Sequence, residues 1–382
     1  MQDSIWFQTI PSTQRRVLEQ SDPLPKTADV AIVGAGLIGI ATAYYLTEAG
    51  VRDVCVLDSG AALGEASGAN AGGLWFAQQN VELGPVAALA AASSRLYDLL
   101  AGRFAFDFER PGLIELLDDA DDPAVRQRVD LTREAGFQVE EVSGRGARSL
   151  EPGLGITPAA ALLYPSDGKL HPVKLGAELV KHLRGRGVRF CLGAEVRSLR
   201  PSIDTAQGLL SAGKTVIAAG AWTPLITRSL GWVPPVKPMR GTLAAVSPLP
   251  KTLHHTLVTS KYYYWQLESG EVAGGGSVDD VGFERGVDAT TLARIREEME
   301  ALIPAVAGRP ACCCWSGFRP YCADLKPVIG PVPGQDGLFV AAGHFKKGVM
   351  LAPVTGKIIA DLIAKGATDL EIAALSPGRF RS

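Results

Sequence analysis

The chain has 382 residues with 47% hydrophobic and 20% charged side chains, which is typical of a globular protein of about two domains. Its net charge of −2 argues against a nucleic-acid partner, because such a surface normally needs a basic face. Six cysteines are too few for a disulfide framework in a chain of this length. No run reaches the ~20 apolar residues of a membrane span, and the first residues lack a secretory signal, so we expect a cytoplasmic protein.

The first predicted elements form one unit. The prolines within residues 1–27 break any long helix, and the apolar run over 29–33 predicts a buried strand. A glycine turn over 34–39 leads into a helical pattern that ends at Gly50, and a second buried strand follows over 53–58. Strand, glycine turn, helix and strand within about thirty residues predict a βαβ unit with a right-handed crossover.

The rest of the chain mixes helical and strand patterns without a repeat of fixed period. Residues 77–148 are mainly helical, and 253–277 favours strands, with an aromatic-rich strand over 262–266. The other segments predict helices over 173–187, 290–302 and 353–364, and strands over 188–192, 215–220 and 337–343.

Three glycines in the first turn predict a bound dinucleotide. Gly34 permits the tight turn, Gly36 lets the backbone approach a pyrophosphate, and Gly39 allows close packing of the helix on the strand. The helix N-terminus offers free N–H groups and the positive end of its dipole. Asp58 ends the second strand, 19 residues after Gly39, where its carboxylate can accept the ribose hydroxyls of an adenosine. The turn by itself does not distinguish NAD from FAD.

A segment of small residues over 64–73 indicates FAD. It resembles the loop with which the D-amino-acid-oxidase superfamily of flavoproteins wraps its flavin. Small side chains suit this loop because its backbone must approach the isoalloxazine and the pyrophosphate closely. Later segments resemble the same superfamily in the same order, and those near the C-terminus closely resemble glycine oxidase. These segments are 167–172, 218–222, 317–320, 326–330 and 343–353.

The resemblance extends over about 29–364 and implies an α/β protein of two domains with a non-covalent FAD. A Rossmann-like FAD-binding domain would comprise 1–76, 149–220 and 317–382, and a substrate domain with a large, mainly antiparallel sheet would comprise 77–148 and 221–316. The predicted FAD-binding residues are Gly34, Gly36, Leu37, Ile38, Gly39, Asp58, Ser59, Ser67, Asn70, Ala71, Gly72, Gly73, Val196, Ala219, Gly220, Trp222, Gly343, Lys346, Lys347, Gly348, Val349 and Met350.

Enzymes of this superfamily oxidise a C–N bond next to a carboxylate by transferring hydride to flavin N5, and the imine product then hydrolyses. Arg319 matches the substrate arginine of glycine oxidase, and a guanidinium grips a carboxylate with two parallel hydrogen bonds. Tyr263 and Tyr264 are candidates for assisting it. Because adjacent strand residues point to opposite faces, only one of the two should contribute. Tyr321 is a weaker candidate.

The segment after His344 and Phe345 departs from glycine oxidase, which has arginine and asparagine where this chain has Lys346 and Lys347. A lysine is a point charge rather than a planar fork, so these residues suit either a different substrate anion or the negative charge of reduced flavin near N1 and C2=O. His344 is a weak candidate for a general base, because a histidine in such a turn more often packs locally. Arg240 and Gly241 resemble the family's Arg-Gly turn, where we expect Arg240 to be structural, with a contact to the substrate as the less favoured alternative.

The run Cys312-Cys313-Cys314 does not match a zinc site, which uses two spaced pairs, so we predict no metal. Some sarcosine oxidases attach flavin through a cysteine in this region, but that position falls on Gly317 here. Covalent attachment through Cys314 or Cys322 is therefore not favoured, and we interpret the run as a buried strand.

The sequence thus favours FAD-dependent oxidation of a small amino acid or N-substituted glycine, such as glycine, sarcosine, a D-amino acid or iminodiacetate. The electrons would pass to O₂ in an oxidase, or to a partner if the chain is the β-type subunit of a hetero-oligomeric amino-acid or opine dehydrogenase. A flavin-binding assembly subunit without turnover is a further alternative, against which Arg319 argues. Both a homo-oligomer and a hetero-oligomer are compatible with these alternatives.

Overall fold

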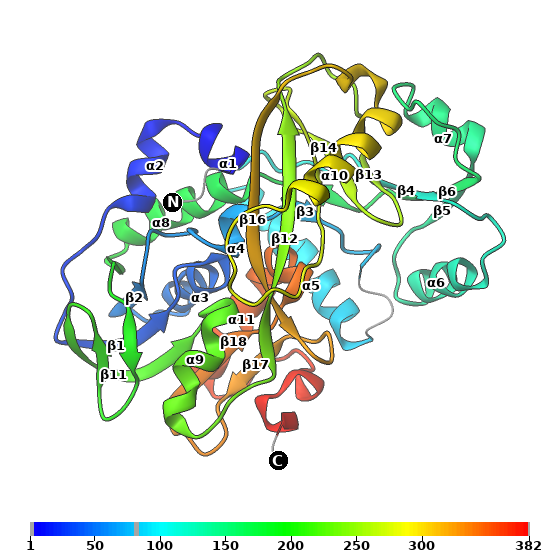
Figure 1. Ribbon diagram of the computed structural model, residues 1–382. Helices are drawn as coiled ribbons and strands as arrows, with labels where there is room; N and C mark the ends of the chain where they lie inside the picture. The colour runs from blue at the N-terminus through cyan, green and yellow to red at the C-terminus, as the bar shows by residue number, and fades with distance from the viewer. Residues whose placement is uncertain (1–3, 80–83, 381–382) are drawn as a thin grey trace.

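Two large sheets form the framework of the protein, whose computed structural model describes residues 4–79 and 84–380 (Figure 1). In the first sheet the neighbouring pairs of the six main strands are parallel except the pair of its two C-terminal strands, and the two short strands that extend the sheet pair in antiparallel orientation. Two short strands extend it, because β10 (Ile203–Thr205) pairs with β9 (Val196–Ser198) and with the long β11. The strand order is β17 (Val328–Pro331), β18 (Leu338–Ala342), β11 (Gly208–Ile217), β1 (Thr27–Val33), β2 (Val54–Asp58) and β8 (Arg189–Leu192).

The second sheet is mainly antiparallel, as predicted, and one of its neighbouring pairs, β13 with β4, is parallel. One strand of this sheet, over 160–164, lies within the range 149–220 that the sequence assigned to the FAD-binding domain, so the domain bounds stay a prediction. The strand order is β16 (Ala311–Cys322), β12 (Val236–Val246), β15 (Val272–Gly275), β14 (Tyr263–Gln266), β13 (Thr256–Val258), β4 (Leu113–Leu117), β6 (Ala160–Tyr164) and β5 (Glu140–Ser143).

The predicted βαβ unit is confirmed: β1 leads through a glycine turn into α3 (Leu37–Glu48) and then into β2, which pairs in parallel with β1. The unit is packed backbone against backbone. A Cβ at position 39 would lie 1.9 Å from the carbonyl oxygen of Gly34, and a Cβ at position 34 would lie 2.4 Å from the carbonyl oxygen of Ala218. Only glycine fits at these two positions, so α3 begins directly against the ends of β1 and β11.

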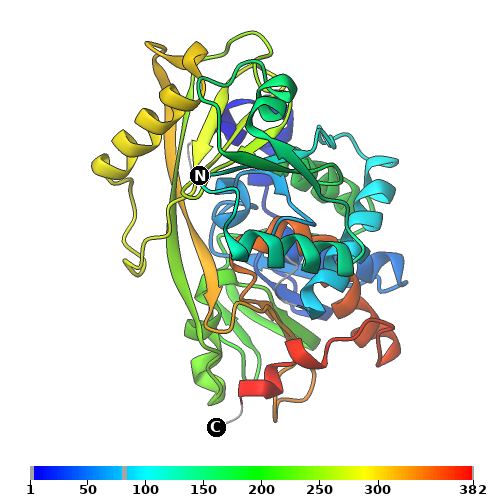
Figure 2. The ribbon, with the colours of Figure 1, turned by 90° about the vertical axis from the view of Figure 1, so that its right-hand side faces the viewer.

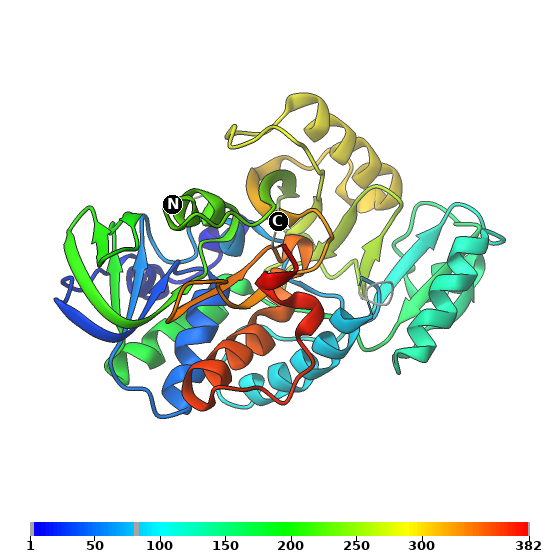
Figure 3. The ribbon, with the colours of Figure 1, turned by 90° about the horizontal axis from the view of Figure 1, so that it is seen from below.

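Helices cover both sheets. Figure 3 shows α11 (Gly348–Lys365), α3 and α5 (Pro85–Ala101) side by side beneath the first sheet, and α8 (Pro172–Gly185) also packs on α3. In Figure 2, α10 (Ala289–Leu302) lies on the outer face of the second sheet, against β12 and β15. None of the helices within the described residues is long and apolar enough to cross a membrane. The remaining helices are α1 (Ile5–Gln8), α2 (Ser12–Glu19), α4 (Ala66–Ala69), α6 (Pro123–Glu134), α7 (Gly144–Leu150) and α9 (Thr223–Thr227).

The C-terminal helix differs from its prediction. The sequence predicted that it begins at Pro353, but α11 begins five residues earlier, at Gly348, and Pro353 lies inside it. Proline has no N–H, so the carbonyl of Val349 loses its donor in the helix. The hydroxyl of the buried Tyr97 on α5 donates to this carbonyl at 2.5 Å, and Ser93 donates to the neighbouring Met350 carbonyl. These contacts allow the helix to run through the proline.

We expect Tyr97→Phe to lower the free energy of unfolding by about 1–3 kcal/mol, because it leaves the Val349 carbonyl buried without a donor. Chemical denaturation measures this change. In a Pro353→Ala background the backbone N–H of residue 353 replaces the lost donor, so the same tyrosine substitution should cost much less. An equal cost in both backgrounds would contradict this account of the helix.

Candidate functional site

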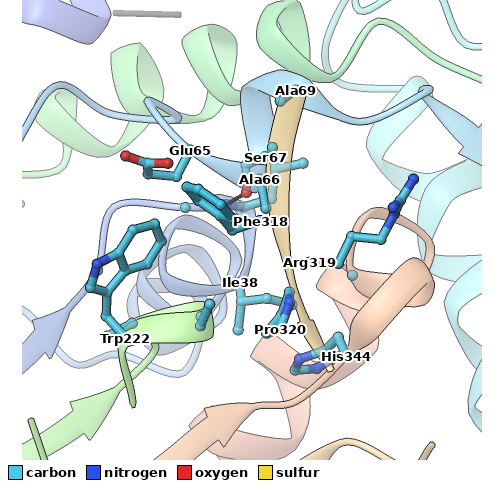
Figure 4. Close-up of a pocket in the computed structure, with 18 of the residues that line it drawn as sticks. Ile38, Glu65, Ala66, Ser67, Ala69, Trp222, Phe318, Arg319, Pro320 and His344 are labelled. Atoms are coloured by element: carbon cyan, nitrogen blue, oxygen red, sulfur yellow. Dashed lines mark hydrogen bonds between the residues drawn. The ribbon is translucent and has the colours of Figure 1, made fainter. Parts of the chain in front are cut away.

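A cavity lies between the two sheets, at the end of β1 and β2 where the glycine turn is found. Segments far apart in the sequence line it, including the turn over 34–38, the loop over 63–71, the segment over 218–222 and the strands β12 and β16. Figure 4 shows Phe318 and Arg319 of β16 on opposite sides of their strand, with Trp222 and Glu65 near Phe318. The cavity therefore has a nucleotide end at the glycine turn and a second end at Arg319.

The loop over 64–73 is joined to the first turn of α3. The Ser67 hydroxyl accepts a hydrogen bond from the backbone N–H of Leu37 at 2.9 Å, and a Cβ at position 36 would lie 3.1 Å from that hydroxyl. Asn70 holds the loop in shape, because its amide donates to the Ser67 carbonyl at 2.5 Å and accepts from the Gly72 N–H at 2.7 Å. The loop and the helix N-terminus thus form one wall.

Asp58 lies at the end of β2, where the sequence placed it, and lines the cavity. Its two carboxylate oxygens accept hydrogen bonds from the backbone N–H groups of Ala35, at 2.7 Å, and Gly60, at 2.9 Å. Burial raises the pKa of Asp58 to about 6, against the opposite effect of these hydrogen bonds. Each carboxylate oxygen has a further lone pair, so the ionised group keeps capacity for ribose hydroxyls.

Arg319 lies at the other end of the cavity and is held by neutral acceptors. Its Nη1 donates to the carbonyl of Ser277 at 2.6 Å and its Nη2 donates to the hydroxyl of Tyr263 at 3.1 Å. The guanidinium lies flat against β12, since a Cβ at position 241 would be 2.0 Å from Nη1. Gly241 is therefore required for this position of Arg319. The ring of Trp75 packs against Tyr263 with centroids 4.7 Å apart.

The two candidate tyrosines point to opposite faces of β14, as the strand alternation predicted. Tyr263 lines the cavity, whereas Tyr264 packs on the far side, in the cluster covered by α10. The hydroxyl of Tyr264 donates to Glu298 on α10 at 3.2 Å. The prediction of Tyr264 as a catalytic residue is therefore not supported by its position, and Tyr263 is the one that meets Arg319.

The segment before α11 brings Lys346 to the cavity but not the side chain of Lys347. Lys346 lines the cavity and is exposed, and desolvation by the neighbouring protein together with the charges of Arg319 and Lys347 lowers its pKa to about 8. His344 also lines the cavity, where its Nε2 lies 3.0 Å from the hydroxyl of Thr355. Burial lowers the pKa of His344 to about 3, so this imidazole is neutral near pH 7.

Most of the other predicted residues line the cavity. Within the described residues, the predicted ones that line it are Gly34, Gly36, Leu37, Ile38, Asp58, Ser59, Ser67, Asn70, Ala71, Gly73, Val196, Ala219, Gly220, Trp222, Lys346, Gly348, Val349, Tyr263 and Arg319. Those that lie behind this lining are Gly39, Gly72, Gly343, Lys347, Met350 and Tyr264. Gly39 and Gly72 have packing roles there, since a Cβ at position 72 would lie 2.3 Å from the Leu170 carbonyl oxygen.

Sequence reasoning missed part of the cavity wall. Arg285 reaches across from the loop after β15 to form an ion pair with Glu65 at 2.7 Å. Beside it, Phe283 packs on Trp222 and Phe318, with ring centroids 4.8 and 5.5 Å apart. No sequence pattern connects residues this far apart, so only the fold could reveal this pair. Trp75 carried a local signal, because it lies two residues after the last glycine of the flavin loop.

Neither cysteine that was weighed for a covalent link lines the cavity. At position 317, which the sequence analysis matched to the flavin-linking cysteine of some sarcosine oxidases, a Cβ would lie 2.7 Å from the Cβ of Ala69. The prediction of a buried cysteine run is wrong, since Cys312 and Cys314 are exposed. The reason is that β16 is an edge strand of its sheet, with solvent beside it. Tyr321 packs on Phe345 and does not line the cavity.

The donors and the space in this cavity fit a flavin dinucleotide. The N-termini of two long helices face it, α3 through Gly36 and Leu37 and α11 through Gly348 and Val349. A helix N-terminus favours negative charge, which suits a pyrophosphate at one end and an anionic flavin ring at the other. At Gly220, whose φ is +53°, no atom lies within 4 Å of a Cβ position, so the wall there is open to a ligand.

Comparison with known proteins agrees with this geometry. Residues 29–362 match the family described as FAD dependent oxidoreductase. The chain is 31% identical to the glycine oxidase of Geobacillus kaustophilus over 365 residues, which cover 91% of this chain and 96% of that protein. It is 27% identical to the hydrogen cyanide synthase subunit HcnC of Pseudomonas aeruginosa, over 93% of this chain and 97% of that subunit.

Solved structures show the same fold. The crystal structure of glycine oxidase from Geobacillus kaustophilus superimposes with a TM-score of 0.88 at 28% identity, covering 94% of this chain and 100% of that one. L-proline dehydrogenase from P. horikoshii shares the fold at 22% identity, with a TM-score of 0.87 over 94% of this chain and 98% of that chain. FAD is thus the cofactor of this enzyme, and the chain belongs to the FAD-dependent oxidoreductase family of the D-amino-acid-oxidase superfamily.

Proposed function

We propose that this protein oxidises the C–N bond of a small amino acid or N-substituted glycine, and that Arg319 binds the substrate carboxylate. The observation that carries the proposal is the position of Arg319 in the same cavity as the glycine turn and Asp58. The guanidinium there has only neutral acceptors, the Ser277 carbonyl and the Tyr263 hydroxyl, among the described side-chain contacts. Its charge is therefore available to an anionic substrate.

The substrate end has the composition that a small carboxylate needs. Tyr263 places a hydroxyl beside the Arg319 guanidinium, so both groups can donate to one carboxylate. Lys346 adds a second cation to the same cavity, and its lowered pKa means that this charge declines above about pH 8. The acidic residues that line the described cavity are Asp58, Glu65 and Glu195, and Glu65 is paired with Arg285. Figure 4 shows Glu65 on the side of β16 opposite to Arg319.

The residues of the nucleotide end would hold FAD in this proposal. Asp58 would accept the ribose hydroxyls, and the first turn of α3 would face the pyrophosphate. The N-terminus of α11, with Gly348 and Val349, would favour negative charge on the flavin ring, a role for which the sequence had suggested either Lys347 or the backbone that follows it. FAD supplies the two-electron acceptor for the oxidation. The chain itself binds the carboxylate, orients the C–N bond and encloses the site.

The test of the proposed function is anaerobic bleaching of the flavin absorbance by a panel of glycine, sarcosine, D-alanine, both prolines and iminodiacetate. At least one of these should bleach the flavin. Arg319→Met should then raise KM for that substrate by about 100-fold, because a desolvated charge pair to the carboxylate is lost. An unchanged KM in a variant that retains its FAD would show that Arg319 is not the carboxylate ligand.

The two tyrosines of β14 provide a matched pair of variants. Tyr263→Phe removes a hydroxyl that faces Arg319 and should raise KM roughly ten- to 100-fold, the effect of one hydrogen bond to a charged group. Tyr264→Phe removes a hydroxyl of the same strand that bonds Glu298, and it should change stability without changing KM. Steady-state kinetics and thermal unfolding of both variants distinguish the two roles. Equal effects on KM would contradict the assignment of Tyr263.

The raised pKa of Asp58 predicts that the affinity for FAD depends on pH. The ionised carboxylate accepts ribose hydroxyls, and burial raises its pKa to about 6, so protonation below this pH removes the acceptor. FAD affinity should therefore fall as the pH drops through about 6, by up to tenfold per pH unit. Equilibrium dialysis with free FAD measures it. Asp58→Asn should bind FAD roughly tenfold more weakly near pH 7 and lose most of this pH dependence, and a variant that keeps the pH dependence would exclude Asp58 as its source.

A further inference from the structure

We infer that Arg240 is a positioning residue for the carboxylate site: its guanidinium neutralises Asp279 and so keeps the charge of Arg319 available to the substrate. This inference rests on the proposed role of Arg319 as the carboxylate ligand. It concerns a residue that does not line the cavity and that makes no contact with substrate.

Arg240 is buried on β12, next to Gly241, and is 7% exposed. It is joined to Asp279 twice through the backbone, since each N–H donates to the other residue's carbonyl at 2.9 Å. Its side chain follows the same direction, with Nε 3.5 Å from the Asp279 carboxylate and Nη1 donating to the Glu284 carbonyl at 3.3 Å. Arg240 therefore fixes both the path of the 279–284 loop and the charge of Asp279.

A short chain of contacts connects Asp279 to Arg319. The Ser277 hydroxyl donates to the Asp279 carboxylate at 3.1 Å and accepts from the backbone N–H of Thr242 at 3.0 Å. The carbonyl of the same serine accepts from Nη1 of Arg319 at 2.6 Å. Asp279 thus fixes the hydroxyl of Ser277, and the carbonyl of Ser277 fixes Arg319.

The charges along this chain explain why two arginines are needed. Asp279 lies only two residues from the carbonyl that Arg319 contacts, and its side chain is 22% exposed, which leaves it room to change rotamer. Without Arg240, the Asp279 carboxylate would be an unneutralised anion near an unneutralised guanidinium, and the two would attract each other. A carboxylate paired with Arg319 would compete with the substrate carboxylate for the same donors.

Gly241 makes the position of Arg319 sensitive to this loop. The guanidinium lies over the bare backbone of β12, where even a Cβ at position 241 would come within 2.0 Å of Nη1. Position 241 of β12 therefore offers Arg319 no side-chain contact. The Ser277 carbonyl and the Tyr263 hydroxyl are the hydrogen-bond acceptors that fix the orientation of its guanidinium. The Arg240–Asp279 pair determines where one of these two acceptors lies.

The test compares Arg240→Met, Asp279→Asn and the double variant, each purified with FAD bound. Acetate serves as a simple carboxylate, and its binding is followed by the change in flavin absorbance, with KM and kcat measured for the amino acid that bleaches the flavin. We expect Arg240→Met to weaken acetate binding and raise KM about tenfold, with kcat changed less than about threefold, because the freed Asp279 competes for Arg319. The double variant should return both values to within about threefold of the wild type, since the competing carboxylate is gone.

A merely structural role for Arg240 gives a different pattern, because removing a second buried partner does not repair a damaged fold. Acetate binding unchanged in Arg240→Met, or as weak in the double variant as in the single one, would overturn the inference. If Arg240→Met does not retain FAD, Asp279→Asn decides the question alone: acetate binding should stay equal or tighten, and a clear weakening would contradict the inference. Arg319→Met separates the two proposals. If that variant still binds acetate fully, Arg319 is not the carboxylate ligand, and the proposal for the carboxylate site itself fails.

Discussion

The contact between the first turn of α3 and the strand before it is the constraint on which the rest of the site depends. At Gly39 the helix backbone lies so close to the Gly34 carbonyl that no side chain fits between them. This contact fixes where α3 begins and so directs its N-terminal N–H groups into the cavity. A second close contact places α11, because a Cβ at Gly356 would lie 2.5 Å from the backbone of Ala41 on α3. Close backbone packing thus directs two helix N-termini toward one cavity, and Tyr97 and Ser93 support the first turn of α11.

The second sheet brings Arg319 to the same cavity, at the end opposite to the glycine turn. The long strands β12 and β16 run from the second sheet down to the first, as Figure 1 shows, and Arg319 lies on β16 near that lower end. The cavity is therefore built by two sheets with different tasks. The parallel sheet presents helix N-termini and Asp58 to the cavity, while the antiparallel sheet presents Arg319 and the Tyr263 hydroxyl, which we propose bind a carboxylate.

Charge is arranged around this cavity so that the guanidinium of Arg319 has no carboxylate partner among the described contacts. Asp58 is held by backbone N–H groups, Glu65 by Arg285, and Asp279 by Arg240. Arg319 and Lys346 remain without a carboxylate partner among the described contacts. Two cations without a carboxylate partner beside one cavity favour an anionic ligand, because opposite charges attract more strongly where the protein excludes part of the water.

The sequence by itself determined the features that depend on local spacing. Glycines at 34, 36 and 39, the two flanking strands and Asp58 belong to one βαβ unit, and steric limits on backbone packing make that pattern readable along the chain. Arg319 was singled out in a different way, because the motif around it resembles the one that carries the substrate arginine of glycine oxidase. Only the tertiary structure decided which of Tyr263 and Tyr264 meets Arg319, how Tyr97 supports a helix through Pro353, and that Arg285 pairs with Glu65. The first outcome depends on which face of a strand is covered. The pair of Arg285 and Glu65 joins residues more than 200 positions apart in the sequence. No local pattern in a single sequence records such contacts.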